Sequence, residues 1–157
     1  MKKNIKIKEP IIKSCANITL PMALVLGIYV ILHGHLSPGG GFQGGVIVAG
    51  AIAIVFIAYG YKEVFAVFNM ERVKVSEDIG AIGYVFVAAL GLIYGFDFCT
   101  NVIWHGIPGK LFSSGTIFWM NFAVGFKVTA GIGFLIIMMV ANLYQTSEYE
   151  DEDEDTK

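Results

Sequence analysis

The chain has 157 residues, of which 55% are hydrophobic and 15% are charged, and its formal net charge is −2 at pH 7. With a mean hydropathy of +0.66, this composition argues against a single soluble domain. A membrane span needs about 20 mainly apolar residues, and four stretches qualify, at about 16–36, 41–61, 79–96 and 117–143. Because these stretches show no strand-like alternation, the sequence predicts an all-α integral membrane protein with four transmembrane helices.

Basic residues indicate which way the chain crosses the membrane. Five lysines precede the first span, and Lys62, Arg72 and Lys74 lie between the second and third spans, whereas the segment after the third span contains only Lys110. Since cytoplasmic loops carry an excess of Lys and Arg, we expect both termini in the cytoplasm and the protein in the cytoplasmic membrane. The first span is too long for a cleaved signal peptide and no cleavage site follows it, so it is interpreted as retained.

A glycine-rich turn joins the first two spans, and two histidines precede it. The turn and the start of the second span consist of Pro38, Gly39, Gly40, Gly41, Phe42, Gln43, Gly44 and Gly45. His33 and His35 would lie about 200° apart on a helix, so they cannot both face one site unless the helix has ended. One of them is a candidate for a protonatable group in an ion path, because histidine titrates near neutral pH. A role in capping the turn is the simpler alternative.

Small residues recur on one face of three of the spans. They are Gly41, Gly45, Ala49 and Ala53 in the second span, Gly83 and Gly91 in the third, and Gly125 and Gly133 in the fourth. Small residues at such spacings let helix backbones approach closely. We therefore expect these faces to pack against other helices, of this chain or of a partner.

The segments outside the spans are short and polar. In the loop of residues 62–78, apolar and charged residues alternate irregularly, which is typical of a short interfacial helix. Ser76, Glu77 and Asp78 at its end are expected to cap the third span and to supply N-terminal negative charge. The four-helix membrane domain is expected to cover residues 1–147, and the acidic residues 148–157 a disordered tail.

Neither the cysteines nor any motif indicates a catalytic or metal site. Cys15 lies at the inner end of the first span and Cys99 just beyond the outer end of the third. They should be separated by about a bilayer thickness, ~30 Å, which is too far for a disulfide. No nucleophile elbow, phosphate-binding loop or metal-ligand spacing is present in the sequence, so we expect neither catalytic residues nor metal ligands.

Lys127 is the most unusual polar residue of the four predicted spans. It lies about ten residues from the outer end of the fourth span, roughly 15 Å deep at 1.5 Å per residue. A lysine side chain reaches only about 6 Å, so its ammonium group does not easily extend to water. An ionisable residue at this depth indicates either a member of a proton or ion relay or a static ion pair. No Asp or Glu lies inside the four predicted spans, so a carboxylate partner is expected from another subunit.

The run His35-Leu36-Ser37-Pro38-Gly39-Gly40-Gly41-Phe42, with Gly44-Gly45 after it, resembles the MnhB/MrpB family of Mrp-type multisubunit sodium/proton antiporters. The chain length, the four spans and the lysine in the last span are also similar. The resemblance implies a non-enzymatic subunit that binds no cofactor, in a complex that transports Na+ and H+. Its partners would be the other membrane subunits of the antiporter module.

Related MnhB-type subunits occur in the membrane arms of respiratory hydrogenases and sulfur-reducing complexes, where iron–sulfur subunits would be further partners. Leu36-Ser37 and Gln43 depart from the antiporter version of the motif and favour this respiratory type. The alternatives are a subunit of a stand-alone Mrp antiporter and a purely structural scaffold. A self-sufficient channel is disfavoured because the predicted spans contain no carboxylate and no broken-helix repeat. The surroundings are the lipid bilayer, and no nucleic acid is expected among the partners.

Overall fold

The computed structural model describes the backbone of residues 5–60, 65 and 69–155, and the side chains of residues 10–60, 65 and 69–143. Its helices are α1 (Ile5–Leu32), α2 (Gly41–Tyr59), α4 (Met70–Ile93) and α5 (Thr116–Asp155). Each helix includes a stretch long and apolar enough to cross a membrane. The described residues contain no strand, and the predicted all-α, four-span fold class is confirmed.

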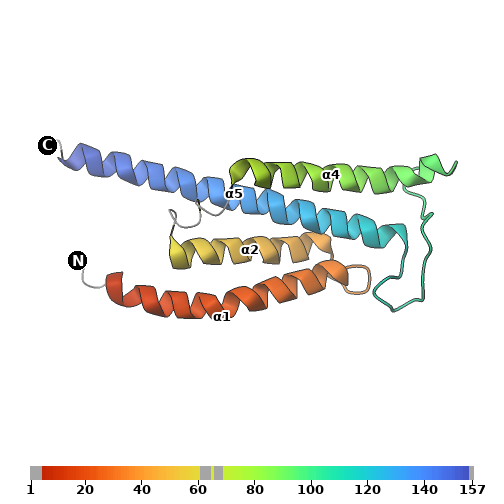
Figure 1. Ribbon diagram of the computed structural model, residues 1–157, viewed down its shortest axis with the longest axis horizontal. Coiled ribbons are helices and arrows are strands. Elements are labelled where there is room, and N and C mark those ends of the chain that lie inside the picture. The colour runs from red at the N-terminus through yellow and green to blue at the C-terminus, as the bar shows by residue number, and fades with distance from the viewer. Residues whose placement is uncertain (1–4, 61–64, 66–68, 156–157) are drawn as a thin grey trace.

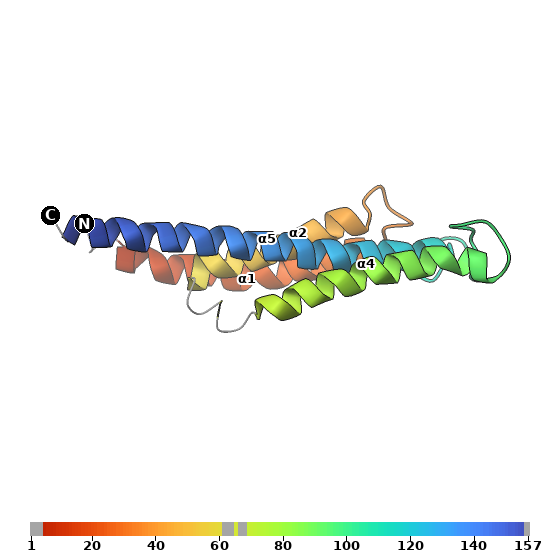
Figure 2. The same ribbon diagram turned by 90° about the horizontal axis from the view of Figure 1, so that it is seen from above.

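The four helices lie side by side in the spatial order α1, α2, α5, α4 (Figures 1 and 2). α2 packs between α1 and α5, and α4 packs on the other side of α5. α1 touches α5 only over a short stretch, and within the described chain α4 approaches neither α1 nor α2. The first helix begins and the last helix ends at the same end of the molecule (Figure 1). The arrangement is therefore an open row, in which α1 and α4 are the edge helices.

An open row buries few large side chains. In the span of α2, 39% of the residues are buried, against 17% in the spans of the edge helices α1 and α4. Phe56 of α2 and Ile137 of α5 form the apolar core cluster, with Ile52 and Val140 packed against it. Most other large apolar side chains are exposed, which suits contact with lipid or with neighbouring subunits.

Glycines allow α2 to approach both of its neighbours closely. A Cβ atom on Gly45 would lie 2.8 Å from the carbonyl oxygen of Gly125 in α5, and a Cβ atom on Gly44 would lie 2.8 Å from the carbonyl oxygen of Gly27 in α1. Ala49, one turn after Gly45, is fully buried. Contacts of backbone against backbone at this distance tolerate no side chain, which explains why α2 occupies an inner position of the row.

The third span differs from the prediction at both ends. α4 begins at Met70 and ends at Ile93, whereas the sequence predicted a span over residues 79–96. Asn69 caps the helix, because its side-chain oxygen accepts hydrogen bonds from the backbone N–H groups of Glu71 and Arg72 at 3.0 and 3.4 Å. An Asn cap satisfies N–H groups that have no partner within the helix, so it fixes the start of α4 at this point.

Ser76, Glu77 and Asp78 consequently lie inside α4 instead of at its cap. The statement that no Asp or Glu lies within a span is therefore wrong. Charged residues lower the local hydropathy, but no proline or glycine lies between Met70 and Ile79 to interrupt the helix. This correction places a carboxylate, Glu77, within a candidate membrane span.

Three further predictions differ from the structure or lie partly outside it. α1 ends at Leu32, so the next four residues form a turn instead of the last turn of the predicted first span. α5 continues through Asp155, so the acidic run expected to be disordered is helical, and no proline or glycine separates it from the span. The interfacial helix predicted within residues 62–78 falls partly on residues 61–64 and 66–68, outside the described residues, and its remainder mostly belongs to α4.

Candidate ion-path site

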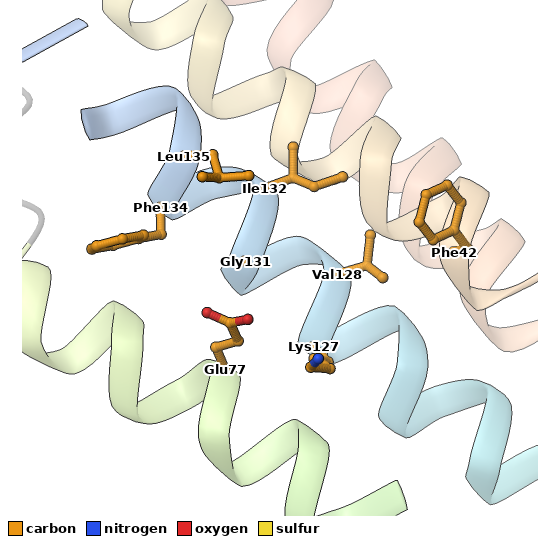
Figure 3. Close-up of a pocket in the computed structure, with 8 residues that line it drawn as sticks. All are labelled: Phe42, Glu77, Lys127, Val128, Gly131, Ile132, Phe134 and Leu135. Carbon is orange, nitrogen blue, oxygen red and sulfur yellow. The ribbon is translucent and has the colours of Figure 1, made fainter. Parts of the chain in front are cut away.

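A groove of about 420 Å³ opens between α4 and α5 and extends to the start of α2 (Figure 3). The residues that line it are Phe42, Glu77, Lys127, Val128, Gly131, Ile132, Phe134 and Leu135. Of these lining residues, only Glu77 and Lys127 carry an ionisable side chain. The groove therefore presents one carboxylate and one ammonium group between apolar walls.

Both charged residues lie near the middle of their spans. Gly80 of α4 packs directly on Lys127, since a Cβ atom on Gly80 would be 2.9 Å from the Cα atom of Lys127. The Oε1 atom of Glu77 lies 3.1 Å from where a Cβ atom of Gly131 would be. At 1.5 Å per residue, Lys127 and Gly131 are roughly 17 and 23 Å from the start of α5, in a span about 40 Å long that ends at Leu143.

Glu77 and Lys127 share the groove without bonding to each other. The carboxylate of Glu77 is half-buried and points from α4 toward α5 at the level of Gly131 (Figure 3), whereas Lys127 is exposed. Within the part of the chain that the structure describes, neither side chain forms an ion pair or a hydrogen bond. The site is thus a separated pair of opposite charges at mid-membrane level.

Asn121 of α5 fixes the turn between α1 and α2. Its Nδ2 atom donates a hydrogen bond to the carbonyl oxygen of Ile31 at 2.7 Å, and its Oδ1 atom accepts one from the backbone N–H of Gly41 at 2.6 Å. One side chain therefore joins the end of α1 to the start of α2. Sequence analysis missed this residue, although an isolated Asn within an apolar span was the available signal.

The glycine-rich turn is shaped by this contact and by its own cap. A Cβ atom on Gly34 would lie 2.3 Å from the Nδ2 atom of Asn121, and one on Gly41 would lie 2.1 Å from its backbone oxygen. The side chain of Gln43 accepts a hydrogen bond from the backbone N–H of Gly40, which caps α2. Pro38 and Gly39 form the tip of the turn. The glycines are required here because the side chain of Asn121 occupies the adjacent space.

The two histidines make separate contacts. The Nδ1 atom of His33 is 3.0 Å from the carbonyl oxygen of Tyr29, and the two rings stack at 4.1 Å. The Nε2 atom of His35 is 3.1 Å from the Oγ atom of Ser113, and its ring lies edge-on to Phe118. His33 therefore bonds to the last turn of α1, and His35 bonds to the segment before α5. Neither histidine lines the groove with Lys127.

The remaining small residues differ in what they contact. Gly83 faces α5, where a Cβ atom would lie 4.0 Å from the Cβ atom of Ala123. Ala53 is half-buried on α2. A Cβ atom on Gly91 would lie 2.3 Å from the carbonyl oxygen of Asp97. Gly91 thus allows the chain to fold back over the end of α4, and its contact is with a connecting segment and not with a helix.

Four membrane-crossing helices in an open row, with opposite charges in a groove at mid-membrane level, define a multi-pass membrane protein with polar groups suited to ion movement. Residues 11–148 match the family described as a domain related to the MnhB subunit of Na+/H+ antiporter. The chain belongs to this family, and the resemblance drawn from the glycine-rich turn is confirmed.

Individual relatives support the same assignment. The chain is 27% identical over 139 residues to an MnhB-type subunit of the Na(+)/H(+) antiporter of Bacillus subtilis, covering 86% of this chain and 94% of that protein. It is 32% identical over 93 residues to a putative antiporter subunit, mnhB2, of Staphylococcus epidermidis, covering 59% of this chain and 65% of that protein. An uncharacterised protein of Methanocaldococcus jannaschii is 36% identical over 130 residues, or 78% of this chain, and the match spans about half (49%) of that protein.

A solved structure shows the same fold in a larger assembly. The structure is that of the membrane-bound sulfane sulfur reductase, an archaeal respiratory membrane complex, and one of its chains superimposes with a TM-score of 0.67 at 31% identity. The match covers 82% of this chain and 56% of that chain. Relatives of this chain therefore include both antiporter subunits and a respiratory membrane protein.

Proposed function

We propose that this chain is an accessory subunit of a multisubunit cation/proton antiporter module, with Na+ and H+ as the transported ions. The observation that carries the proposal is the family match over residues 11–148, which includes nearly all of the four spans. The open row supports it as well, because the exposed apolar faces of α1 and α4 offer surfaces for other membrane subunits. The subunit contributes helix packing and part of an ion path, and it performs no catalysis of its own.

The parent complex is proposed to be of the respiratory type, with hydrogenase-like or iron–sulfur subunits among the partners. The structural likeness to a chain of the sulfane sulfur reductase complex supports this choice. A stand-alone Mrp antiporter is the second candidate, because the Bacillus subtilis protein is similar along almost its whole length. A tagged chain purified in mild detergent, with mass spectrometry of the co-purifying proteins, separates the two.

Each outcome of that purification has a distinct meaning. Antiporter-like membrane subunits together with iron–sulfur proteins support the respiratory complex. Antiporter-like subunits without redox proteins support the stand-alone antiporter. Recovery of the chain alone as a homo-oligomer would refute the accessory-subunit proposal.

Lys127 is proposed as the ion-path residue of the subunit, because it is the cationic residue that lines the groove. The contacts of His33 with Tyr29 and of His35 with Ser113 support a structural role for both histidines in the turn region. In a purely structural scaffold, Lys127 would instead form a static ion pair. A Lys127→Ala variant that assembles normally but loses antiport supports the ion path, whereas failed assembly supports the scaffold. Lys110→Ala, outside the spans, is the matched control.

A further inference from the structure

We infer that Glu77 is a proton-binding carboxylate of the ion path and that Lys127 is the movable counter-charge that controls its protonation. The inference rests on the proposed antiport function and assigns the chemistry of its site. It is carried by the placement of the two residues in one groove at mid-membrane level, with neither bonded to the other.

The position of Glu77 is built into the packing of α4 against α5. Its carboxylate lies against Gly131, where a Cβ atom would approach the Oε1 atom to 3.1 Å, so the missing side chain provides the space that the carboxylate occupies. The neighbouring walls are formed by Ile132 and Phe134, which offer no hydrogen-bond donor from their side chains. A carboxylate anion in such surroundings is costly without a counter-charge. Protonation or a nearby cation removes this cost.

Lys127 can supply that cation without any movement of the helices. Its backbone is held against Gly80 of α4, while its side chain is exposed and has four rotatable methylene groups. An ammonium group turned toward Glu77 stabilises the anion, and one turned toward the open side of the groove leaves the carboxylate without a partner. The side chain is thus free to take either position.

This alternation moves one proton in each cycle. With the ammonium group turned away, the Glu77 carboxylate accepts a proton from water and an O–H bond forms. When the ammonium group of Lys127 returns, that O–H bond breaks and the proton leaves to water or to the next acceptor in the complex. Lys127 remains protonated throughout, so the gain and loss of charge occur on Glu77 alone.

The composition of the groove favours a proton over a metal cation at this site. Hard metal cations are held by several oxygen ligands at once. Among the side chains that line the groove, only Glu77 supplies oxygen atoms. A proton needs a single carboxylate oxygen, which the site provides.

The neighbouring Asp78 offers a matched control for the test, since it lies on the same helix, is exposed, and does not line the groove. Complexes with Glu77→Gln or Asp78→Asn are assembled, and Na+-driven proton exchange is measured in inverted membrane vesicles with a fluorescent pH probe. Because a proton-transferring group contributes roughly 10²–10⁴-fold to rate, Glu77→Gln should lower exchange at least about tenfold, whereas Asp78→Asn should keep it. Normal exchange by an assembled Glu77→Gln complex would overturn the inference, while the purification described above tests the antiporter assignment separately.

A second measurement uses the unmodified complex and does not depend on a variant that folds. Dicyclohexylcarbodiimide adds to protonated carboxyl groups in apolar sites, and mass spectrometry of the treated membranes identifies the modified residue. We expect the adduct on Glu77 and not on Asp78, and more of it in Lys127→Gln, because the counter-charge is then absent. An unlabelled Glu77, or labelling that Na+ suppresses at constant pH, would overturn the assignment of a proton to this site.

Discussion

Replacing Gly45 by alanine should weaken the packing between the two central helices. A Cβ atom at this position would lie 2.8 Å from the carbonyl oxygen of Gly125 and 2.9 Å from the side chain of Val128. The closest atom belongs to the backbone of α5 and cannot rotate away. Gly50 lies on the same helix, and a Cβ atom there would meet nothing within 4 Å. The pair Gly45→Ala and Gly50→Ala therefore changes helix propensity equally and packing unequally.

The expected size of the effect follows from these two contributions. Replacing an interior glycine by alanine favours the helix by about 1 kcal/mol in either variant. Overpacking a tight contact costs roughly 1–3 kcal/mol, and this cost applies only to Gly45→Ala. In the difference between the two variants the propensity cancels, so Gly45→Ala should be less stable than Gly50→Ala by the packing cost alone.

The stability difference can be measured on the chain in its complex. A fluorescent fusion of each variant is co-expressed with its partner subunits, heated in mild detergent, and examined by gel filtration for the fraction that stays monodisperse. For a chain of this size, each kcal/mol shifts the midpoint by about 2–4 °C, so the midpoint of Gly45→Ala should be lower by several degrees. Equal midpoints would refute the close approach of α2 to α5 at this residue.

Three further predictions concern the turns and the orientation. In a Cys15→Ser variant, a membrane-impermeant maleimide should label the exposed Cys99 in intact cells, and labelling only after the cells are opened would reverse the predicted orientation. Asn121→Ala removes two hydrogen bonds and should lower the thermal midpoint by the equivalent of about 1–3 kcal/mol; an unchanged midpoint would contradict its bridging role. Gly115→Ala should be less stable than Gly109→Ala, because both have positive φ but only Gly115 has backbone within 2.4 Å of the new Cβ atom.

Hydropathy alone located the fourth span almost completely. The sequence predicted residues 117–143, and the structure has a candidate span over Thr116–Leu143. The agreement has a simple cause, because the backbone polar groups of an apolar run in a bilayer must be satisfied within the run itself, which requires a helix. The same reasoning placed the second span, whose helix ends at Tyr59 just before Gly60 with φ of +85°.

Hydropathy failed at Glu77, the residue on which the proposed ion path depends. A sequence reading that equates charge with loop assigns residues 70–78 to the membrane surface, although nothing in them prevents a helix. The signal that could have corrected it is Asn69, followed by Glu71 in the first turn, a pattern typical of a helix start. Charged residues inside a span are uncommon, so an interpretation based on averages discards them where they are functional.

The order of the helices could not be predicted from the chain, since α2 carries small residues on two faces. Gly44 meets α1 and Gly45 meets α5, yet the sequence shows only that both positions are small. The contact of Asn121 with Gly41 joins residues that are 80 positions apart. Spacing along one helix identifies a face suited to close packing, but the partner of that face is decided by the fit of two surfaces.

The position of the groove within the row bears on how the subunit would act in a complex. α4 is an edge helix with α5 as its neighbour within the described chain, and Lys127 is exposed beside it. A charge exposed to lipid at this depth is unfavourable, whereas a neighbouring membrane subunit on this side would exclude lipid and could present the next proton acceptor. If Glu77 and Lys127 act as proposed, the ion path is completed at this edge of the row, and proton exchange requires the assembled complex.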